Sequence, residues 1–256
     1  MNQLSPGTVV LVGGGPGDPD LITVGGLRAV QQADVIVYDR LAPLAVLDQA
    51  RPDAEKIDVG KIPRGPQTSQ EDINAILIEQ ARQGRRVVRL KGGDNFLFGR
   101  GGEEAIECAQ AGVPVQVIPG VSSSIAAPAL AGIPVTHRGL SQGVTIVSGH
   151  VHPQDPRSDL DWAALAGTHT TLVILMGVKY LPEIAAELVA AGLAAQTPAA
   201  IVMNAGSDQM RVWRAPVGEI AEVARREDVA PPAITIIGAV AALELAQAAP
   251  PEADRS

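Results

Sequence analysis

The chain has 256 residues, of which 46% are hydrophobic and only 2% aromatic, and its formal net charge is −8. This length is enough for one large domain or two small ones, and the core must be built from Ala, Val, Leu and Ile. The negative charge and the scarcity of aromatic side chains argue against a nucleic acid partner. One cysteine, Cys108, excludes an internal disulfide.

The N-terminus lacks the basic start and long apolar run of a signal peptide. No apolar stretch reaches the roughly 18 residues that would span a bilayer. We therefore expect a cytoplasmic protein with no membrane partner.

Short β-branched runs alternate with Ala- and Leu-rich stretches in the first half of the chain. The expected strands are residues 9–12, 35–38, 87–90 and 115–118, and the expected helices are residues 22–32, 70–83 and 102–111. Such alternation indicates an α/β fold with a largely parallel sheet.

The segment 133–142 is polar and interrupted by Gly and Pro, which is typical of a join between two halves. After it the pattern restarts, with expected strands at 144–147, 171–176, 199–203 and 233–237 and expected helices at 181–191 and 217–226. We predict two α/β domains, residues 1–138 and 143–247, followed by a disordered tail at 248–256.

A first glycine-rich loop, residues 13–20, directly follows the first expected strand. It is similar to a dinucleotide-binding loop, and Asp39 after the next strand would supply a carboxylate for a ribose. Asp18 replaces the third glycine of that motif, however, and Asp18 and Asp20 would repel a pyrophosphate at the helix N-terminus. The loop favours a ligand without phosphates or a simple capped turn. A dinucleotide-dependent oxidoreductase stays as the weaker alternative.

A second glycine-rich loop lies within residues 90–104, LKGGDNFLFGRGGEE, after a strand and before a helix. Its glycines permit close backbone approach to a ligand. No Gly-Lys-Ser/Thr follows, so the loop is not a phosphate-binding P-loop. Both phenylalanines of the chain fall here beside charged residues, a combination that favours binding over a surface turn.

Basic residues cluster near the predicted loop ends and predict a locally positive cleft for an anionic substrate, although each alone would serve as a solvated charge. They are Arg40, Lys61, Arg64, Lys91, Arg100 and Arg138. Four histidines and one cysteine without zinc-type spacing predict no metal site, and His150 and His152 are expected to be ordinary loop residues. Ser124 breaks a G-x-S-x-G pattern, which argues against a serine hydrolase.

An ordered set of motifs spans the chain from Val9 to Leu243: VGGGPGDPDLIT, ADVIVYDRL, VGK, LKGGD, FGRGGEE, AGIPVTHRG, VSGH, MGV and PPAITIIG. This set resembles the uroporphyrinogen-III C-methyltransferases, which are tetrapyrrole methylases. The resemblance implies two α/β domains with S-adenosylmethionine in a cleft between them, and a homodimer. It also implies methylation of uroporphyrinogen III at C2 and C7 to give precorrin-2, for cobalamin or sirohaem biosynthesis. Methylation of a later precorrin is the alternative, which YDRL and FGRGGEE disfavour.

The resemblance further implies roles for individual residues. The S-adenosylmethionine contacts fall on Pro16, Gly92, Gly93, Asp94, Leu97, Ser122, Ser123, Met176, Ala205 and Ala233. Asp39 and Lys61 fall where the family's proposed proton acceptor and donor lie. Arg100, Glu103 and Arg138 fall on positions that face the tetrapyrrole. Among these, Arg100 is expected to be a carboxylate clamp, because a guanidinium with a pKa above about 12 is a poor base.

The chain departs from the family pattern at three positions. Asn95 stands where proline is usual, Ile62 replaces a basic residue, and Met203 replaces a common glutamate. Because the first expected strand begins at residue 9, we expect no preceding oxidase domain and no need for NAD⁺ or iron.

Overall fold

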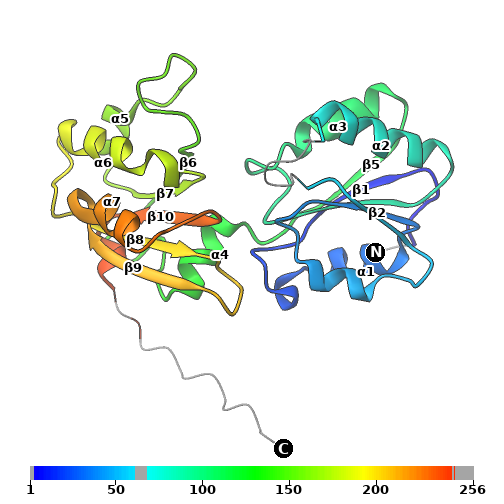
Figure 1. The fold of residues 1–256 in the computed structure, drawn as a ribbon, viewed down its shortest axis with the longest axis horizontal. Helices are drawn as coiled ribbons and strands as arrows, with labels where there is room; N and C mark the ends of the chain where they lie inside the picture. The colour runs from blue at the N-terminus through cyan, green and yellow to red at the C-terminus, as the bar shows by residue number, and fades with distance from the viewer. Residues whose placement is uncertain (1–2, 61–67, 244, 246–256) are drawn as a thin grey trace, which may run out of the picture. The chain divides into compact units, whose positions relative to one another are not determined.

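The computed structural model describes residues 3–60, 68–243 and 245, which divide into two compact units (Figure 1). The first unit ends at Ala126 and also includes Gly206–Asp208, and the second holds the remaining described residues. Each unit contains a five-stranded sheet flanked by helices, which confirms the predicted α/β fold class. The division falls inside helix α4 (Ser123–Leu130), earlier in the chain than the predicted join.

The first sheet is parallel throughout and has the strand order β3-β2-β4-β1-β5. Its strands are β1 (Val9–Gly13), β2 (Val35–Tyr38), β3 (Glu55–Asp58), β4 (Val87–Lys91) and β5 (Val115–Ile118). The helices of this unit are α1 (Val24–Gln32), α2 (Gln70–Arg82) and α3 (Gly101–Gln110), with short 3₁₀ turns η1 (Pro19–Leu21) and η2 (Leu44–Gln49). The largely parallel sheet predicted for this half is therefore present, with β3 added at one edge.

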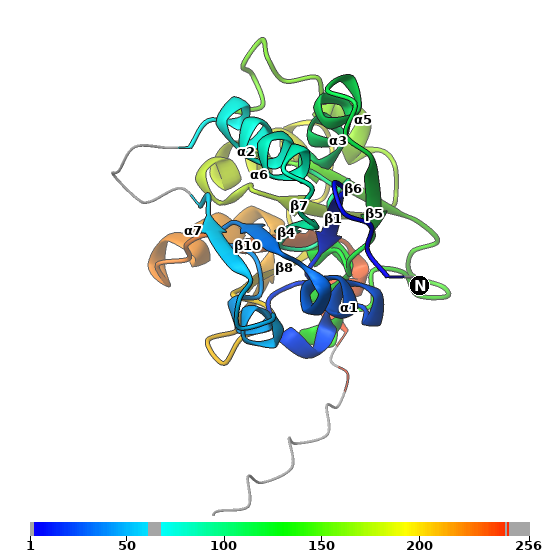
Figure 2. The ribbon, with the colours of Figure 1, turned by 90° about the vertical axis from the view of Figure 1, so that its right-hand side faces the viewer.

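Helices cover both faces of this sheet, with α1 on one face and α2 and α3 on the other (Figure 1 and Figure 2). Successive strand residues point to opposite faces. On β4, Val88 and Leu90 accordingly join the core that includes α1 residues, and Val87 joins the core formed with α2 and α3. The same alternation directs Arg89 and Lys91 of β4 into the layer of α2 and α3, where both side chains are buried.

The second sheet has the order β6-β7-β10-β8-β9, and only the β6/β7 pair among its described strands is parallel. Its strands are β6 (Val144–Ser148), β7 (Thr171–Leu175), β8 (Pro198–Met203), β9 (Arg211–Pro216) and β10 (Ala233–Ile237). One face packs against α5 (Trp162–Ala166), α6 (Leu181–Ala190) and α7 (Val217–Arg226), and the other packs against the end of α4 and η4 (Ala239–Ala242). The restart of the sequence pattern therefore yields a mixed sheet rather than a second parallel one.

No helix among the described residues is both long enough and apolar enough to cross a membrane. The tail predicted at 248–256 lies outside the described residues.

Asp34 links the amino ends of β2 and β4 through one carboxylate. Its Oδ2 accepts hydrogen bonds from Arg86 N at 2.8 Å and Arg86 Nε at 2.9 Å. Its Oδ1 accepts from Arg86 Nη2 at 2.6 Å and Arg51 Nη2 at 3.1 Å. These bonds, above all those from the Arg86 side chain, hold the pKa of Asp34 well below its usual range.

We expect Asp34→Asn to lower the free energy of unfolding by about 1–3 kcal/mol at pH 7, because hydrogen bonds to a charged group are lost. A depressed carboxyl pKa stabilises the fold above the unfolded pKa of about 3.9, and that stabilisation disappears as the pH falls further. Urea unfolding at pH 7 and pH 3 measures both effects, and the difference between variant and parent should shrink at pH 3.

Glu222→Gln is the matched control, since its partner Arg225 is 75% exposed and Glu222 is 60% exposed. Such exposed pairs contribute about 0–1 kcal/mol. The stabilising role of the Asp34 carboxylate would be contradicted if Asp34→Asn lost no more unfolding free energy than Glu222→Gln, or if its loss did not depend on pH.

Candidate functional site

The carboxyl edge of the first sheet contains a topological switch point. From β1 the chain moves to β2 on one side, and from β4 it moves to β5 on the other side, while β1 and β4 are hydrogen-bonded neighbours. In open parallel sheets, ligands bind at the carboxyl ends of the strands where the connections diverge. Both glycine-rich loops identified in the sequence begin at this point, after β1 and after β4.

Backbone hydrogen bonds join these two loops. Gly14 N donates to Lys91 O at 2.7 Å, and Gly15 and Gly93 exchange two bonds, of 3.2 Å and 2.6 Å. Gly93 has a φ of 65°, a conformation that glycine adopts without steric cost. The loops after β1 and β4 therefore form one connected backbone surface.

Asp94 connects the loop after β5 to the same surface. Its Oδ2 accepts from Gly120 N at 3.0 Å, and its Oδ1 accepts from Phe96 N at 2.8 Å. The contact is close, since a Cβ added to Gly13 would lie 2.6 Å from the Cα of Gly120 and 2.8 Å from the oxygen of Gly93. The three loops can therefore approach one another in this way only with glycine at positions 13 and 120.

The structure brings the first-unit residues predicted to bind S-adenosylmethionine into these three loops. They are Pro16 after β1, Gly92, Gly93, Asp94 and Leu97 after β4, and Ser122 and Ser123 after β5. Ser122 directly precedes α4, and its backbone oxygen accepts from Ile125 N and Ala126 N. A Cβ at Gly93 would lie 3.3 Å from Ser123 Oγ, so the glycine keeps the space before this hydroxyl open.

The predicted residues of the second unit gather at one edge of its sheet. Met176 follows β7 and is 49% exposed, Ala205 lies shortly after β8, and Ala233 begins β10. The β10 ladder pairs Ile234 with Leu175 and Ala233 with Met203, so these positions are neighbours across adjacent strands. Arg138 lies apart from them in sequence, exposed in the loop between α4 and β6.

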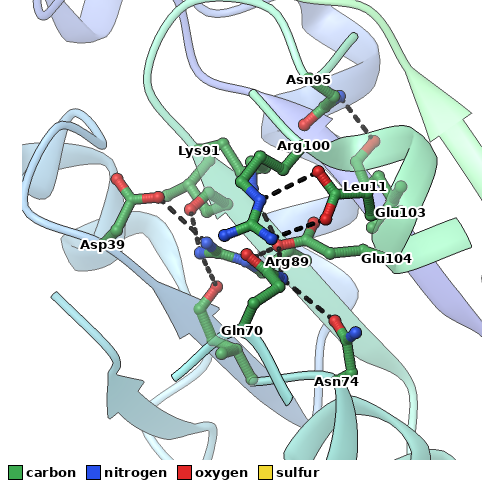
Figure 3. A network of polar contacts seen from close by, with 12 residues as sticks. Leu11, Asp39, Gln70, Asn74, Arg89, Lys91, Asn95, Arg100, Glu103 and Glu104 are labelled. Carbon is green, nitrogen blue, oxygen red and sulfur yellow. Dashed lines mark hydrogen bonds and ion pairs between the residues drawn. The ribbon is translucent and has the colours of Figure 1, made fainter. Parts of the chain in front are cut away.

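A network of buried charges lies beneath the loop after β4 (Figure 3). Glu104 of α3 is fully buried, and its Oε1 accepts from Lys91 Nζ at 2.8 Å, Arg89 Nε at 3.1 Å and Gln70 Nε2 at 3.3 Å. Gln70 Nε2 also donates to Asn74 Oδ1 at 3.0 Å, and this bond within α2 holds the Gln70 amide in place. The other oxygen of Glu104, Oε2, has no partner within the part of the chain that the structure describes.

Lys91 shows that one sequence prediction was wrong. It was expected to contribute to a positive cleft, but it is 6% exposed and its ammonium is paired with Glu104. Burial, followed by the nearby Arg89 charge, lowers the pKa of Lys91, and the attraction of Glu104 opposes that shift. Lys91 is therefore part of the interior rather than a surface cation. Lys61 and Arg64, predicted for the same cleft, lie outside the described residues, as does Ile62.

Asp39, the predicted proton acceptor, lies at the exposed end of this network. Its Oδ2 accepts from Arg89 Nη2 at 3.0 Å, and its Oδ1 accepts from Leu41 N at 3.1 Å. The side chain of Asp39 is 27% exposed, whereas that of Arg89 is 3% exposed. Arg89 and Leu41 thus fix the Asp39 carboxylate, while the rest of its surface is open to solvent.

Arg100 and Glu103 form a surface pair at the start of α3. Arg100 Nε donates to Glu103 Oε1 at 2.9 Å and Nη2 donates to Oε2 at 2.6 Å, and both side chains are more than half exposed. The pair raises the pKa of Arg100 and lowers that of Glu103. Because exposed pairs contribute little stability, Arg100 can exchange Glu103 for another carboxylate at small cost.

Asn95, which stands where the family usually has proline, supports the loops from inside. It is fully buried, and its Nδ2 donates to Leu11 O at 3.2 Å and Ile118 O at 3.1 Å, joining β1 to β5. Its backbone oxygen accepts from Gly101 N at 3.0 Å. The amide thus provides a link that proline would lack.

Arg89 and Glu104 were not predicted as parts of the site. The arginine inside the apolar run VVRL indicated a buried ion pair, because a buried arginine requires a partner. The identity of that partner depended on the packing of α3 against β4, which no local pattern gives.

Asp18 caps the short turn η1 by accepting from Asp20 N at 2.9 Å, as expected for a capped turn. Contrary to the prediction, it does not lie at the start of the following helix, because α1 begins at Val24 and Thr23 Oγ1 caps it by accepting from Gly26 N. Within residues 3–60, 68–243 and 245, no three His, Cys, Asp or Glu side chains form a group that would hold a metal.

The family model described as Tetrapyrrole (Corrin/Porphyrin) Methylases matches residues 8–221 of the chain. Siroheme synthase from Stutzerimonas stutzeri is 48% identical over 237 residues, which cover 93% of this chain and 50% of that protein. The chain thus spans about half the length of the curated relatives it matches.

Two solved structures share both fold and sequence with the chain. Uroporphyrin-III C-methyltransferase from Thermus thermophilus, complexed with S-adenosylhomocysteine, is 41% identical with a TM-score of 0.77, over 91% of this chain and 92% of that one. A cobalt precorrin-4 methyltransferase of cobalamin biosynthesis is 27% identical with a TM-score of 0.82, over 92% of this chain and 96% of that one.

The contact between Gly13 and Gly120 leads to a prediction about stability. We expect Gly13→Ala and Gly120→Ala each to lower the free energy of unfolding by about 1–3 kcal/mol, because the added methyl group overlaps backbone atoms. Gly102→Ala is the control, since nothing lies within 4 Å of its Cβ position and alanine favours the helix.

Urea unfolding of the three single variants and of the Gly13/Gly120 double variant provides the measurement. The double variant should be no more stable than either single one. Wild-type stability in Gly13→Ala or Gly120→Ala would show that the loops separate more easily than the structure indicates.

Proposed function

The chain belongs to the tetrapyrrole (corrin/porphyrin) methylase family, and we propose that it methylates uroporphyrinogen III at C2 and C7 with S-adenosylmethionine, giving precorrin-2. The observation that carries the proposal is the connected surface of three loops at the switch point of the first sheet. These loops present backbone groups, hydroxyls and the Asp94 carboxylate.

The residues of this surface suit an S-adenosyl ligand. Gly92 and Gly93 permit close approach of the ligand to the backbone, and Ser122 and Ser123 offer hydroxyl groups. Leu97 would supply an apolar contact and Pro16 a further one. Met176, Ala205 and Ala233, which belong to the second unit, are proposed contacts on the family resemblance alone. When bound, S-adenosylmethionine supplies an electrophilic methyl group on its sulfonium, so the chemistry needs no metal.

The protein contributes orientation and proton removal. Holding two reactants in the productive geometry contributes about 7–11 kcal/mol to a reaction of this kind. A pyrrole that gains a methyl group must lose a proton, and a positioned base accelerates such a step about 10²–10⁴-fold. We assign that base to Asp39, which is fixed by Arg89 and Leu41 and open on its other side. Lys61 would be the proton donor by the family resemblance.

The substrate carries acetate and propionate groups, which require cationic partners. Arg100 is exposed and holds a carboxylate, Glu103, in a two-bond arrangement that a substrate carboxylate would reproduce. Arg138 is the second proposed partner. Glu103 would keep the Arg100 guanidinium oriented before the substrate arrives. A homodimer in the cytoplasm, serving cobalamin or sirohaem synthesis, is a proposal that rests on the family resemblance.

We expect anaerobic incubation with uroporphyrinogen III and S-adenosylmethionine to add two methyl groups, measured by mass spectrometry, with no effect of NAD⁺. Addition of only one methyl group, or preferential methylation of a later precorrin, would indicate another reaction of the family instead. Formation of an oxidised product that depends on NAD⁺ would support the oxidoreductase alternative instead.

We expect Asp94→Ala to weaken S-adenosylhomocysteine binding at least tenfold in calorimetry, because the loops after β4 and β5 lose their shared carboxylate. Asp94→Asn, which retains one oxygen acceptor, should lose less affinity. The control is Asp161→Ala, which removes the N-cap of α5 and costs stability without touching the three loops. Equal affinity in folded Asp94→Ala and the parent would remove Asp94 from the binding site.

A further inference from the structure

We infer that Arg89 is a positioning residue for Asp39, and that Glu104 holds Arg89 in that task. The inference rests on the proposed function, since it assumes that Asp39 removes the proton. It adds a buried support, formed by β4 and α3, to a reaction that takes place at the loops.

The geometry connects the two carboxylates through one guanidinium (Figure 3). Arg89 Nε donates to Glu104 Oε1 at 3.1 Å, and Nη2 donates to Asp39 Oδ2 at 3.0 Å. The remaining nitrogen, Nη1, donates to the backbone oxygens of Leu90 at 3.2 Å and Val37 at 3.4 Å. Because a guanidinium is planar and its donors are fixed relative to one another, these contacts determine where the Nη2 bond points.

Burial increases along this connection from Asp39 to Glu104. The exposed fractions of the side chains are 27% for Asp39, 3% for Arg89 and 0% for Glu104. A buried arginine without a carboxylate partner is strongly destabilised, so Glu104 keeps Arg89 charged and in place. Asp39 is the member of this series that a substrate could reach.

The charges of the network balance. Arg89 and Lys91 carry two positive charges, and Glu104 and Asp39 carry two negative charges. Asp58 of β3, paired in register with Tyr38, and Arg40, the next residue of the loop, are further charged groups in this region. The Arg100–Glu103 pair also faces the network, since Arg100 interacts with the charge of Glu104 and Glu103 with that of Lys91. Without Arg89, Lys91 still pairs with Glu104, while Asp39 loses its buried cation. The interior therefore tolerates loss of Arg89, and the effect falls on Asp39.

The consequence of losing Arg89 falls on kcat rather than on substrate binding. The hydrogen bond from Arg89 Nη2 reaches Asp39 from its buried side, so its loss removes the direction of the carboxylate and not a contact with the solvent-facing side. Retaining the charge but not the planar geometry should restore only part of kcat, because a single ammonium does not reproduce the fixed directions of the guanidinium donors.

The test compares Arg89→Met, Arg89→Lys and Asp39→Asn in the intact protein, with uroporphyrinogen III and S-adenosylmethionine as substrates. Arg89→Met should lower kcat about tenfold or more, with little change in KM for S-adenosylmethionine. Arg89→Lys should recover part of that loss. Asp39→Asn is the reference, and adding Arg89→Met to Asp39→Asn should cost little further activity, because the two residues act through one contact.

Arg85→Met is the matched control. Arg85 lies just before the amino end of β4 and pairs with Glu55. This variant therefore removes the same charge from the opposite end of the sheet to Asp39. Its kcat should match that of the parent. If Arg89→Met is too unstable to assay, Arg89→Gln replaces it, since glutamine retains a donor for the backbone oxygens but no charge, and it should lower kcat without a matching rise in KM.

The outcomes separate the inference from the function beneath it. If Asp39→Asn keeps full activity, the proposed role of Asp39 fails. If Asp39→Asn is inactive but Arg89→Met keeps the kcat of the parent, Asp39 is the base and the positioning role of Arg89 is wrong. A purely structural role would lower the melting temperature of both Arg89 variants and leave the kcat of the folded protein unchanged.

Discussion

The fully buried carboxylate of Glu104 is the interaction on which the site depends. One oxygen of this group receives Lys91, Arg89 and Gln70, which come from β4 and α2. Since β4 lies between β2 and β1, the same contacts fix the strand that carries the second glycine-rich loop. Replacing Glu104 with an apolar residue would leave two buried cations facing α3, a cost of several kcal/mol. The pairing of β4 with α3 is therefore an electrostatic requirement as well as a packing preference.

The loops add a second kind of constraint, which is steric. The loops after β1, β4 and β5 meet through backbone atoms, and Asp94 and Asn95 satisfy polar groups that this close approach would otherwise bury without partners. A ligand that binds here would meet a surface whose shape is largely set beforehand. Such preorganisation suits a methyl transfer, in which alignment of the reacting atoms contributes much of the acceleration.

The sequence predicted most of the buried framework but not its edges. Runs such as VVLV and VIVY indicate buried strands without any knowledge of their neighbours. β3 (EKID) and β9 (RVWRAP) were missed because they are edge strands with exposed or half-exposed side chains, which leave no apolar pattern. Strand direction in the second sheet could not be predicted either, because both faces of that sheet are buried, so its central strands show continuous apolar runs like those of a parallel sheet.

The same limit applies to the candidate site, where local motifs identify some residues but not the burial or pairing of others. The glycines and Asp94 follow directly from motifs in the chain, and the structure brings those of the first unit into three joined loops. Lys91 was expected in a cleft, but its burial depends on Glu104, thirteen positions further along the chain. Arg89 escaped notice for the same reason, since pairing between a strand and a distant helix face is a tertiary property.

The position of β10 has a consequence for the order in which the chain takes shape during synthesis. Of the five strands in the second sheet, β10 is the last to be translated, yet it lies between β7 and β8. Apart from Gly206–Asp208, the first unit is complete once Ala126 has left the ribosome, so its parallel sheet can form early. The second sheet has to keep the apolar edges of β7 and β8 apart until Ile237 emerges. A nascent chain that stops short of β10 would therefore expose one unpaired edge on β7 and one on β8, although β7 pairs with β6 and β8 with β9. Such open edges bind chaperones and promote aggregation.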